Sequence, residues 1–144
     1  MIIDPLNLSQ SLIKCPSVTP DNGGSLNVLQ EILTKIGFKC EQVSFSTKDT
    51  PDVTNLYASY GISRPNFCFA GHTDVVPVGD LKSWSVNPFL GVVKNNKLIG
   101  RGASDMKGSI ACFVAALSQI KKMKPKFKGS ISLLITGDEE AIAI

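Results

Sequence analysis

The sequence predicts an α/β fold in which helices pack on both faces of one mixed, mainly parallel sheet. Segments with apolar residues at helical spacing alternate with short runs of consecutive apolar residues. This alternation is typical of buried strands that are joined by helical crossovers. The 144 residues suffice for one domain with a buried core, and they contain no internal repeat, low-complexity tract or linker. We therefore expect one three-layer sandwich.

Two helices are predicted near the N-terminus. The first is expected to begin at Asp4 and Pro5, a capping side chain followed by proline in the first turn, and to end at Pro16. The second should begin at about Ser25 and close at Gly37, because glycine readily adopts the left-handed conformation that ends many helices. Its buried face is marked by four apolar residues at helical spacing: Leu26, Leu29, Leu33 and Ile36.

The spacing of apolar residues then changes to that of strands. Residues 38–45 predict a strand with an irregularity at its middle, and alternation predicts a second strand at 56–60. Residues 66–70 form a continuous apolar run, as expected of a central strand covered on both faces. Residues 92–99 predict a hairpin around two asparagines, and residues 131–136 predict another buried strand.

Composition and charge exclude several classes of function. The net charge is only +3, which is too small to indicate a nucleic-acid or membrane partner. The four cysteines include no C-x-x-C pair of the kind found in zinc ribbons and thioredoxin-like sites. The N-terminus does not resemble a secretory signal, and no apolar run has transmembrane length. These features favour a cytoplasmic protein with free thiols.

The first candidate cluster contains His72 and Asp74. It directly follows the strand at 66–70, and α/β folds commonly place ligands at the carboxyl ends of strands. If the strand conformation continues, His72 and Asp74 point to the same side. The carboxylate would then bind one imidazole nitrogen and leave the other free for a metal. The alternative is that His72, the only histidine, has a structural or surface role.

Two further clusters contain acids. Residues 100–108 hold Asp105 among three glycines, which indicates an unusual backbone path. The alternative is that Asp105 only caps a third helix, which is expected to begin just after it. Asp138, Glu139 and Glu140 follow the strand at 131–136, where the alternative is a solvated acidic loop. The third helix is marked by apolar residues at helical spacing: Ile110, Phe113, Val114, Leu117 and Ile120.

Together the three clusters favour a metal site. One imidazole and several carboxylates suit zinc, cobalt or manganese better than calcium, which prefers oxygen ligands. A shared carboxylate can hold two metals about 3.5–4 Å apart, and adjacent glutamates can then divide metal binding and water activation between them. The sequence has no G-x-S-x-G elbow, no phosphate-binding P-loop and no H-E-x-x-H motif.

Four stretches resemble the M20 metallopeptidases: GHTDVVPVGD at 71–80, the segment 84–89, GRGASDMKG at 100–108 and LLITGDEE at 133–140. The resemblance implies that His72 binds one zinc, Asp105 bridges two zincs and Glu140 binds the second. Cobalt is an alternative metal in one site. The resemblance also implies that Asp74 orients His72 and that Glu139 is the general acid/base for the water between the metals. It further implies a cis peptide after Asp105.

The family resemblance implies an activity as well. The expected enzyme is a homodimer that hydrolyses a small molecule, N-succinyl-LL-2,6-diaminopimelate, to succinate and LL-diaminopimelate in bacterial lysine and diaminopimelate biosynthesis. Acetylornithine deacetylase and aminoacylase activities are the alternatives within the family. The run VVPVGD at 75–80 and the helix at 111–116 favour desuccinylation.

Only the N-terminal part of the metal-binding catalytic domain is expected within residues 1–144. The family's remaining ligands, a carboxylate and a histidine, and its dimerisation domain would lie beyond Ile144, and Ala141 stands where relatives commonly have glycine. Each of two zincs would then have two protein ligands, whereas a catalytic zinc normally has three. We therefore expect the chain alone to be inactive. The alternative function is that of a truncated, non-catalytic domain.

Overall fold

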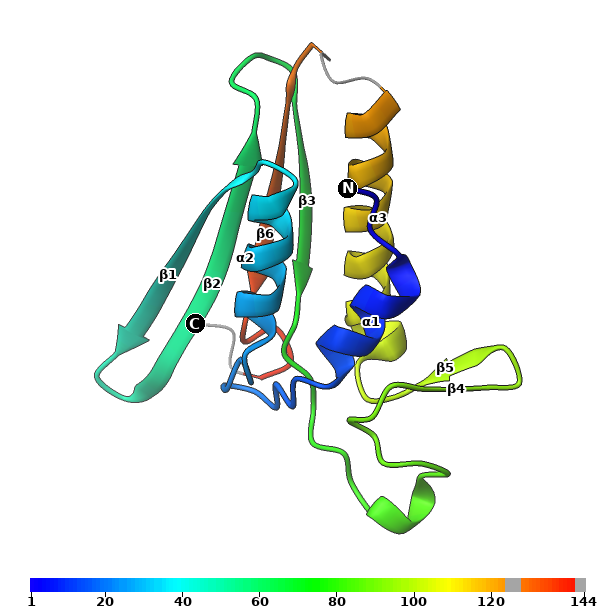
Figure 1. Cartoon of the computed structure of the whole chain (residues 1–144). Helices are drawn as coiled ribbons and strands as arrows, with labels where there is room; N and C mark the ends of the chain where they lie inside the picture. Colours follow the sequence, from blue (N-terminus) through cyan, green and yellow to red (C-terminus); the bar gives the residue numbers. More distant parts are fainter. Residues whose placement is uncertain (124–127, 142–144) are drawn as a thin grey trace.

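The computed structural model describes residues 1–123 and 128–141, and in them helices lie against one side of a sheet (Figure 1). No helix in these residues is long and apolar enough to span a bilayer. The α-helices and strands are α1 (Pro5–Ile13), α2 (Ser25–Lys35), β1 (Lys39–Thr47), β2 (Thr50–Tyr60), β3 (Asn66–His72), β4 (Val92–Lys94), β5 (Lys97–Ile99), α3 (Gly108–Met123) and β6 (Ser130–Thr136), and two short helical turns lie at Leu81–Ser83 and Ala103–Lys107.

The helix ends follow the local signals in the sequence. The Asp4 side chain accepts a hydrogen bond of 2.9 Å from the main-chain N–H of Asn7, so it caps α1 as expected. Gly37 follows α2 with a φ of 85°, which confirms its predicted place at the end of that helix. Helix α3 begins at Gly108 rather than just after Asp105, because Ala103–Lys107 form a separate turn with non-helical φ and ψ at Asp105 and Met106.

The main sheet is mixed, but the prediction that it is mainly parallel was wrong for the described residues. The strand order is β1-β2-β6-β3, and only β3 and β6 are parallel. Strands β1 and β2 are joined by a tight turn after Thr47, and a turn this short can connect only antiparallel strands. Strands β3 and β6 are joined through α3, the kind of crossover that parallel neighbours require.

Two details of the strands also differ from expectation. The irregularity in β1 lies between Phe45 and Thr47 rather than at the middle of the strand. Strand β3 is at the edge of the described sheet, and Phe67 is 60% exposed, whereas the sequence predicted a central strand. Apolar content identified β3 as a strand, but it does not specify which neighbours a strand has. Strands β4 and β5 form the expected hairpin, with positive φ at Asn95 and Asn96.

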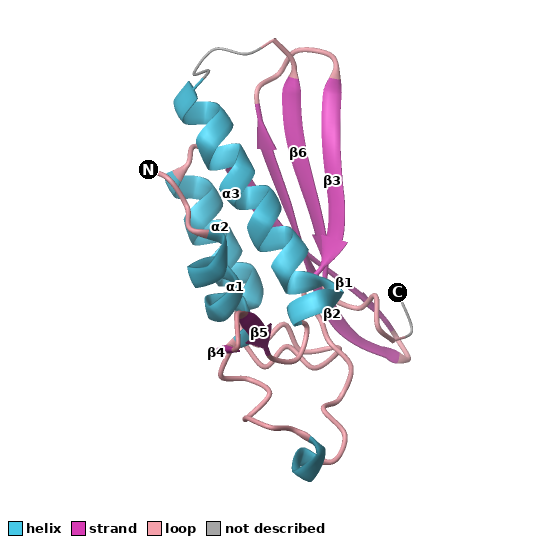
Figure 2. Ribbon diagram, turned by 90° about the vertical axis from the view of Figure 1, so that its right-hand side faces the viewer, coloured by secondary structure: helices cyan, strands magenta, loops and turns pink. Residues whose placement is uncertain are grey.

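The helices α1, α2 and α3 all cover the same face of the sheet (Figure 2). The expectation of helices on both faces is therefore wrong for the described residues, which form two layers. The core between the layers contains Leu56, Leu133 and Ile135 from the strands, together with apolar residues of all three helices. On the opposite face the side chains of Phe45 and Leu134 are exposed.

The parallel pair of β3 and β6 places the candidate residues at one end of the sheet, where both strands have their carboxyl ends. His72, the last residue of β3, lies opposite Thr136, the last residue of β6. The segments that follow the two strands therefore leave the sheet side by side. Because α3 runs back along the sheet, its N-terminal turn lies at this same end (Figure 1).

Candidate metal centre

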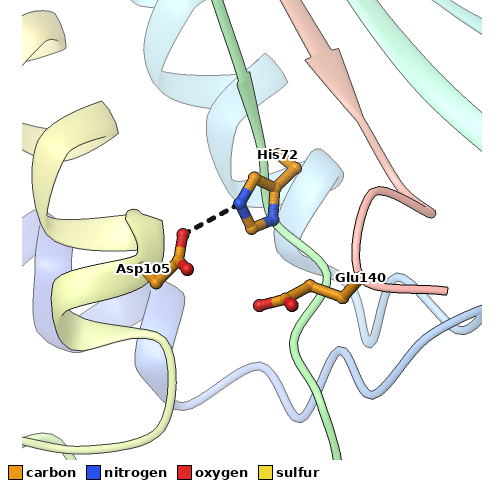
Figure 3. Close-up of side chains that lie close together, drawn as sticks. All are labelled: His72, Asp105 and Glu140. Carbon is orange, nitrogen blue, oxygen red and sulfur yellow. Dashed lines mark hydrogen bonds and ion pairs between the residues drawn. The ribbon is translucent and has the colours of Figure 1, made fainter.

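His72, Asp105 and Glu140 converge from three different segments: the end of β3, the turn before α3 and the loop after β6 (Figure 3). One ligand atom from each residue lies within 4.8 Å of the other two. His72 Nε2 is 3.0 Å from Asp105 Oδ1. The Asp105–Met106 peptide is cis, as the family resemblance implied.

His72 is buried and is held through its other ring nitrogen. Nδ1 lies 3.1 Å from the main-chain carbonyl oxygen of Asp74 and 3.5 Å from that residue's carboxylate. With its proton on Nδ1, the imidazole donates to the carbonyl and leaves Nε2 directed at Asp105 and Glu140. The sequence predicted that Asp74 contacts His72, but it did not predict that the shorter contact involves the main chain.

Asp74 also contacts the loop that carries Glu140. Its side chain is fully buried, and Oδ2 accepts a hydrogen bond of 2.9 Å from the main-chain N–H of Glu140. Oδ1 has no hydrogen-bond partner in the described chain and faces the His72 ring. One carboxylate therefore contacts the segments of two candidate ligands.

Glu139 lies beside the group rather than within it. Its side chain is 60% exposed, and Oε2 is 3.7 Å from His72 Nε2. The preceding Asp138 is buried and accepts a hydrogen bond of 2.6 Å from Thr19 Oγ1. The two glutamates therefore have different environments, Glu140 among the ligand atoms and Glu139 open to solvent.

The pKa values of the group reflect converging negative charge. Burial lowers the pKa of His72, but the hydrogen bond to Asp74 and the carboxylates of Asp74, Asp105 and Glu139 hold it above its ordinary value. Burial and then the charge of Asp105 raise the pKa of Glu140. A divalent cation among these groups would favour their deprotonated forms and reverse both shifts.

The ligand types and spacing fit zinc. Two ligand atoms bound to one zinc at about 2.1 Å lie roughly 3–3.5 Å apart, and the 3.0 Å contact between His72 and Asp105 agrees with this spacing. One nitrogen and two carboxylates also fit cobalt or manganese. The described residues thus bring together one histidine and two acids that could hold a metal ion.

A cleft of about 310 Å³ adjoins the group and is lined by residues 100–105, Val76 and Glu140. Arg101 lies in this wall, with its guanidinium 5.2 Å from the centre of the Trp84 ring and 3.2 Å from the carbonyl oxygen of Pro77. The cleft therefore places Arg101 in the same wall as the candidate ligand Asp105.

Sequence reasoning missed Thr19 and Lys107. Lys107 is fully buried, and its Nζ donates a hydrogen bond of 2.8 Å to the carbonyl oxygen of Cys15. Burial lowers the pKa of Lys107 to about 8. A signal was available, because Lys107, Ile110 and Val114 stand at helical spacing and therefore share a face directed at the core. Nothing in the sequence around Thr19 indicates its contact with Asp138.

Residues 68–143 match the family model described as Peptidase family M20/M25/M40. A curated succinyl-diaminopimelate desuccinylase from Parvibaculum lavamentivorans is 58% identical over 141 residues, covering 98% of this chain and 35% of the relative. Another, from Rhodospirillum centenum, is 51% identical over 144 residues, covering 100% of this chain and 37% of the relative. The chain therefore spans about a third of the length of the curated relatives it matches.

Solved structures share the fold. Human carnosine dipeptidase 1 has a TM-score of 0.83 at 23% identity, covering 97% of this chain and 33% of that chain. An M20 family metallo-carboxypeptidase from Sulfolobus solfataricus has a TM-score of 0.82 at 25% identity, covering 95% of this chain and 31% of that chain. The family match covers just over half of the sequence and includes all three candidate ligands. The chain therefore belongs to peptidase family M20/M25/M40.

Proposed function

We propose that this chain is the metal-binding N-terminal part of the catalytic domain of a two-zinc succinyl-diaminopimelate desuccinylase. The convergence of His72, Asp105 and Glu140 at one end of the sheet is the observation that carries the proposal. The identity of 58% to a curated desuccinylase supports the choice of substrate, N-succinyl-LL-2,6-diaminopimelate. The complete domain is proposed to be the family's three-layer sandwich.

Each candidate residue has a proposed role. His72 binds one zinc, Glu140 binds the other, and Asp105 bridges them, with cobalt an alternative in one site. When bound, the metals polarise the amide carbonyl and make water more acidic. Asp74 orients His72 and holds the main chain of Glu140. The exposed Glu139 carboxylate accepts a proton from the attacking water and delivers it to the leaving amine nitrogen.

The ligand count limits what the 144 residues do alone. With Asp105 shared, each zinc has two protein ligands, one fewer than a catalytic zinc normally has. We therefore propose that this chain binds zinc weakly and does not turn over substrate alone. The proposal places the complete enzyme in the cytoplasm as a homodimer, and the free thiols of Cys15, Cys40, Cys68 and Cys112 are compatible with that location.

The test compares this chain with a complete enzyme that contains it. Zinc titration by calorimetry and hydrolysis of succinylated and acetylated substrates are measured on both. We expect weak binding and no turnover from residues 1–144, and two tightly bound zincs with faster desuccinylation from the complete enzyme. Faster turnover of acetylornithine would refute the choice of substrate. Normal turnover by the 144 residues would refute the ligand count.

A further inference from the structure

Lys107 is the bulkiest of the fully buried side chains in the described residues. Burying an ammonium group is unfavourable by several kcal/mol unless other groups compensate for the lost hydration. The hydrogen bond from Nζ to the carbonyl oxygen of Cys15 compensates in part. A methionine could fill the same space without the cost of burying a charge, so packing alone does not explain a lysine at this position.

The side chain of Lys107 spans the turn that carries Asp105. Its main-chain N–H donates a hydrogen bond of 2.9 Å to the carbonyl oxygen of Gly102, which closes the turn. A Cβ added at Gly102 would lie 3.2 Å from Lys107 Cδ, so the side chain of Lys107 packs closely against this glycine. The far end of the side chain reaches Cys15, just beyond α1.

The segment that Lys107 reaches is itself bonded to the segment that follows His72. The main-chain N–H of Val75 donates a hydrogen bond of 2.8 Å to the carbonyl oxygen of Ser17, and Ser17 Oγ donates one of 2.6 Å to the carbonyl oxygen of Thr73. A continuous set of contacts therefore links Lys107 to the strand end that carries His72. The same strand end carries Asp74, which holds the main chain of Glu140.

We propose that Lys107 is a positioning residue for the metal centre. It fixes the turn of Asp105 against the segment that carries His72. It is not a ligand, because its ammonium is directed at Cys15 rather than into the group. This inference rests on the proposed zinc-binding function. It adds a residue that sets the spacing of the ligands without touching the metal.

The test measures zinc affinity by calorimetry on the complete enzyme that contains this chain, as wild type, Lys107→Met, Lys107→Arg and a control, Lys97→Met. Lys97 is exposed in the hairpin, so the control makes the same chemical change away from the site. We expect Lys107→Met to raise the zinc dissociation constant about 10–100-fold, the usual effect of losing a group that orients ligands. Lys107→Arg should retain more affinity than Lys107→Met, and Lys97→Met should stay within about twofold of wild type.

Cobalt spectra and thermal unfolding separate positioning from a structural role. The visible absorption of bound cobalt should shift in Lys107→Met, because the ligand geometry changes, whereas a purely structural residue would change only the melting temperature. A folded Lys107→Met with wild-type affinity and an unchanged spectrum would overturn the inference. Failure of both Lys107 variants to fold would assign the residue to the core and overturn it as well. Failure of the wild type to bind zinc would instead remove the proposed function.

Discussion

Replacing Glu139 and Glu140 one at a time by glutamine should separate proton transfer from metal binding. Glutamine has nearly the same size as glutamate and removes only the charge and the proton-accepting carboxylate. Glu140 belongs to the group of ligand atoms that lie within 4.8 Å of one another, whereas Glu139 is mostly exposed beside His72. The two exchanges should therefore affect different measurements.

The expected magnitudes follow from the number of ligands. A four-ligand zinc site binds with about 10–16 kcal/mol, or roughly 2.5–4 kcal/mol per ligand. Glu140→Gln should thus weaken binding of one zinc by about 10²–10³-fold, since each 1.4 kcal/mol corresponds to a factor of ten. Glu139→Gln should leave zinc affinity within about threefold, and it should lower turnover of the complete enzyme by about 10²–10⁴-fold.

Calorimetry and elemental analysis give the zinc affinity and stoichiometry of each variant. The control is Glu41→Gln, which changes an exposed glutamate on β1, away from the ligand group. Reversal of the pattern, with zinc lost from Glu139→Gln and retained by Glu140→Gln, would refute the assignment of roles.

Three further predictions follow from the structure. The metal-free chain should lose the stabilisation due to His72 as the pH rises from about 6.5 through the raised pKa of His72, because the folded state favours the protonated ring. Zinc affinity should increase over the same pH range. Thermal unfolding with and without chelator measures both effects. Gly102→Ala places a Cβ 2.7 Å from a methyl group of Val75, at a φ of 78°. The free energy of unfolding, measured in urea, should therefore fall more for Gly102→Ala than for Gly79→Ala. The Cβ of Gly79→Ala meets nothing within 4 Å, so this variant should lose only the roughly 1–2 kcal/mol due to the left-handed backbone conformation. Leu133→Ala should lower the free energy of unfolding by about 2–5 kcal/mol, and Leu134→Ala, 41% exposed on the opposite face, should lower it much less.

The helices could be predicted because their signals are local. The Asp4 cap and Gly37 act within one turn of the helix they bound, so the sequence near each end contains the information. Strand pairing is not local. The apolar run at residues 66–70 identified β3 as a strand, but its place at the edge of the described sheet depends on residues far along the chain.

The relative direction of the strands was wrongly predicted for a related reason. Helices alternating with strands favoured parallel pairing, but β1 and β2 follow each other through a tight turn without a helix between them. The face covered by the helices likewise depends on tertiary packing. Lys107 was missed because lysine is rarely fully buried, although its spacing with Ile110 indicated the core face of α3.

The positions of the candidate ligands could nevertheless be predicted, because they depend on only one part of the sheet. His72 ends β3, Asp105 precedes α3 and Glu140 follows β6, so all three belong to a single strand–helix–strand crossover. In such a crossover the parallel strands end at the same edge, and the joining helix begins there. The antiparallel pairing of β1 and β2 lies outside this unit. The wrong prediction of a mainly parallel sheet therefore did not affect the predicted arrangement of the candidate ligands. For the same reason, a variant that disturbs only β1 should leave zinc affinity unchanged.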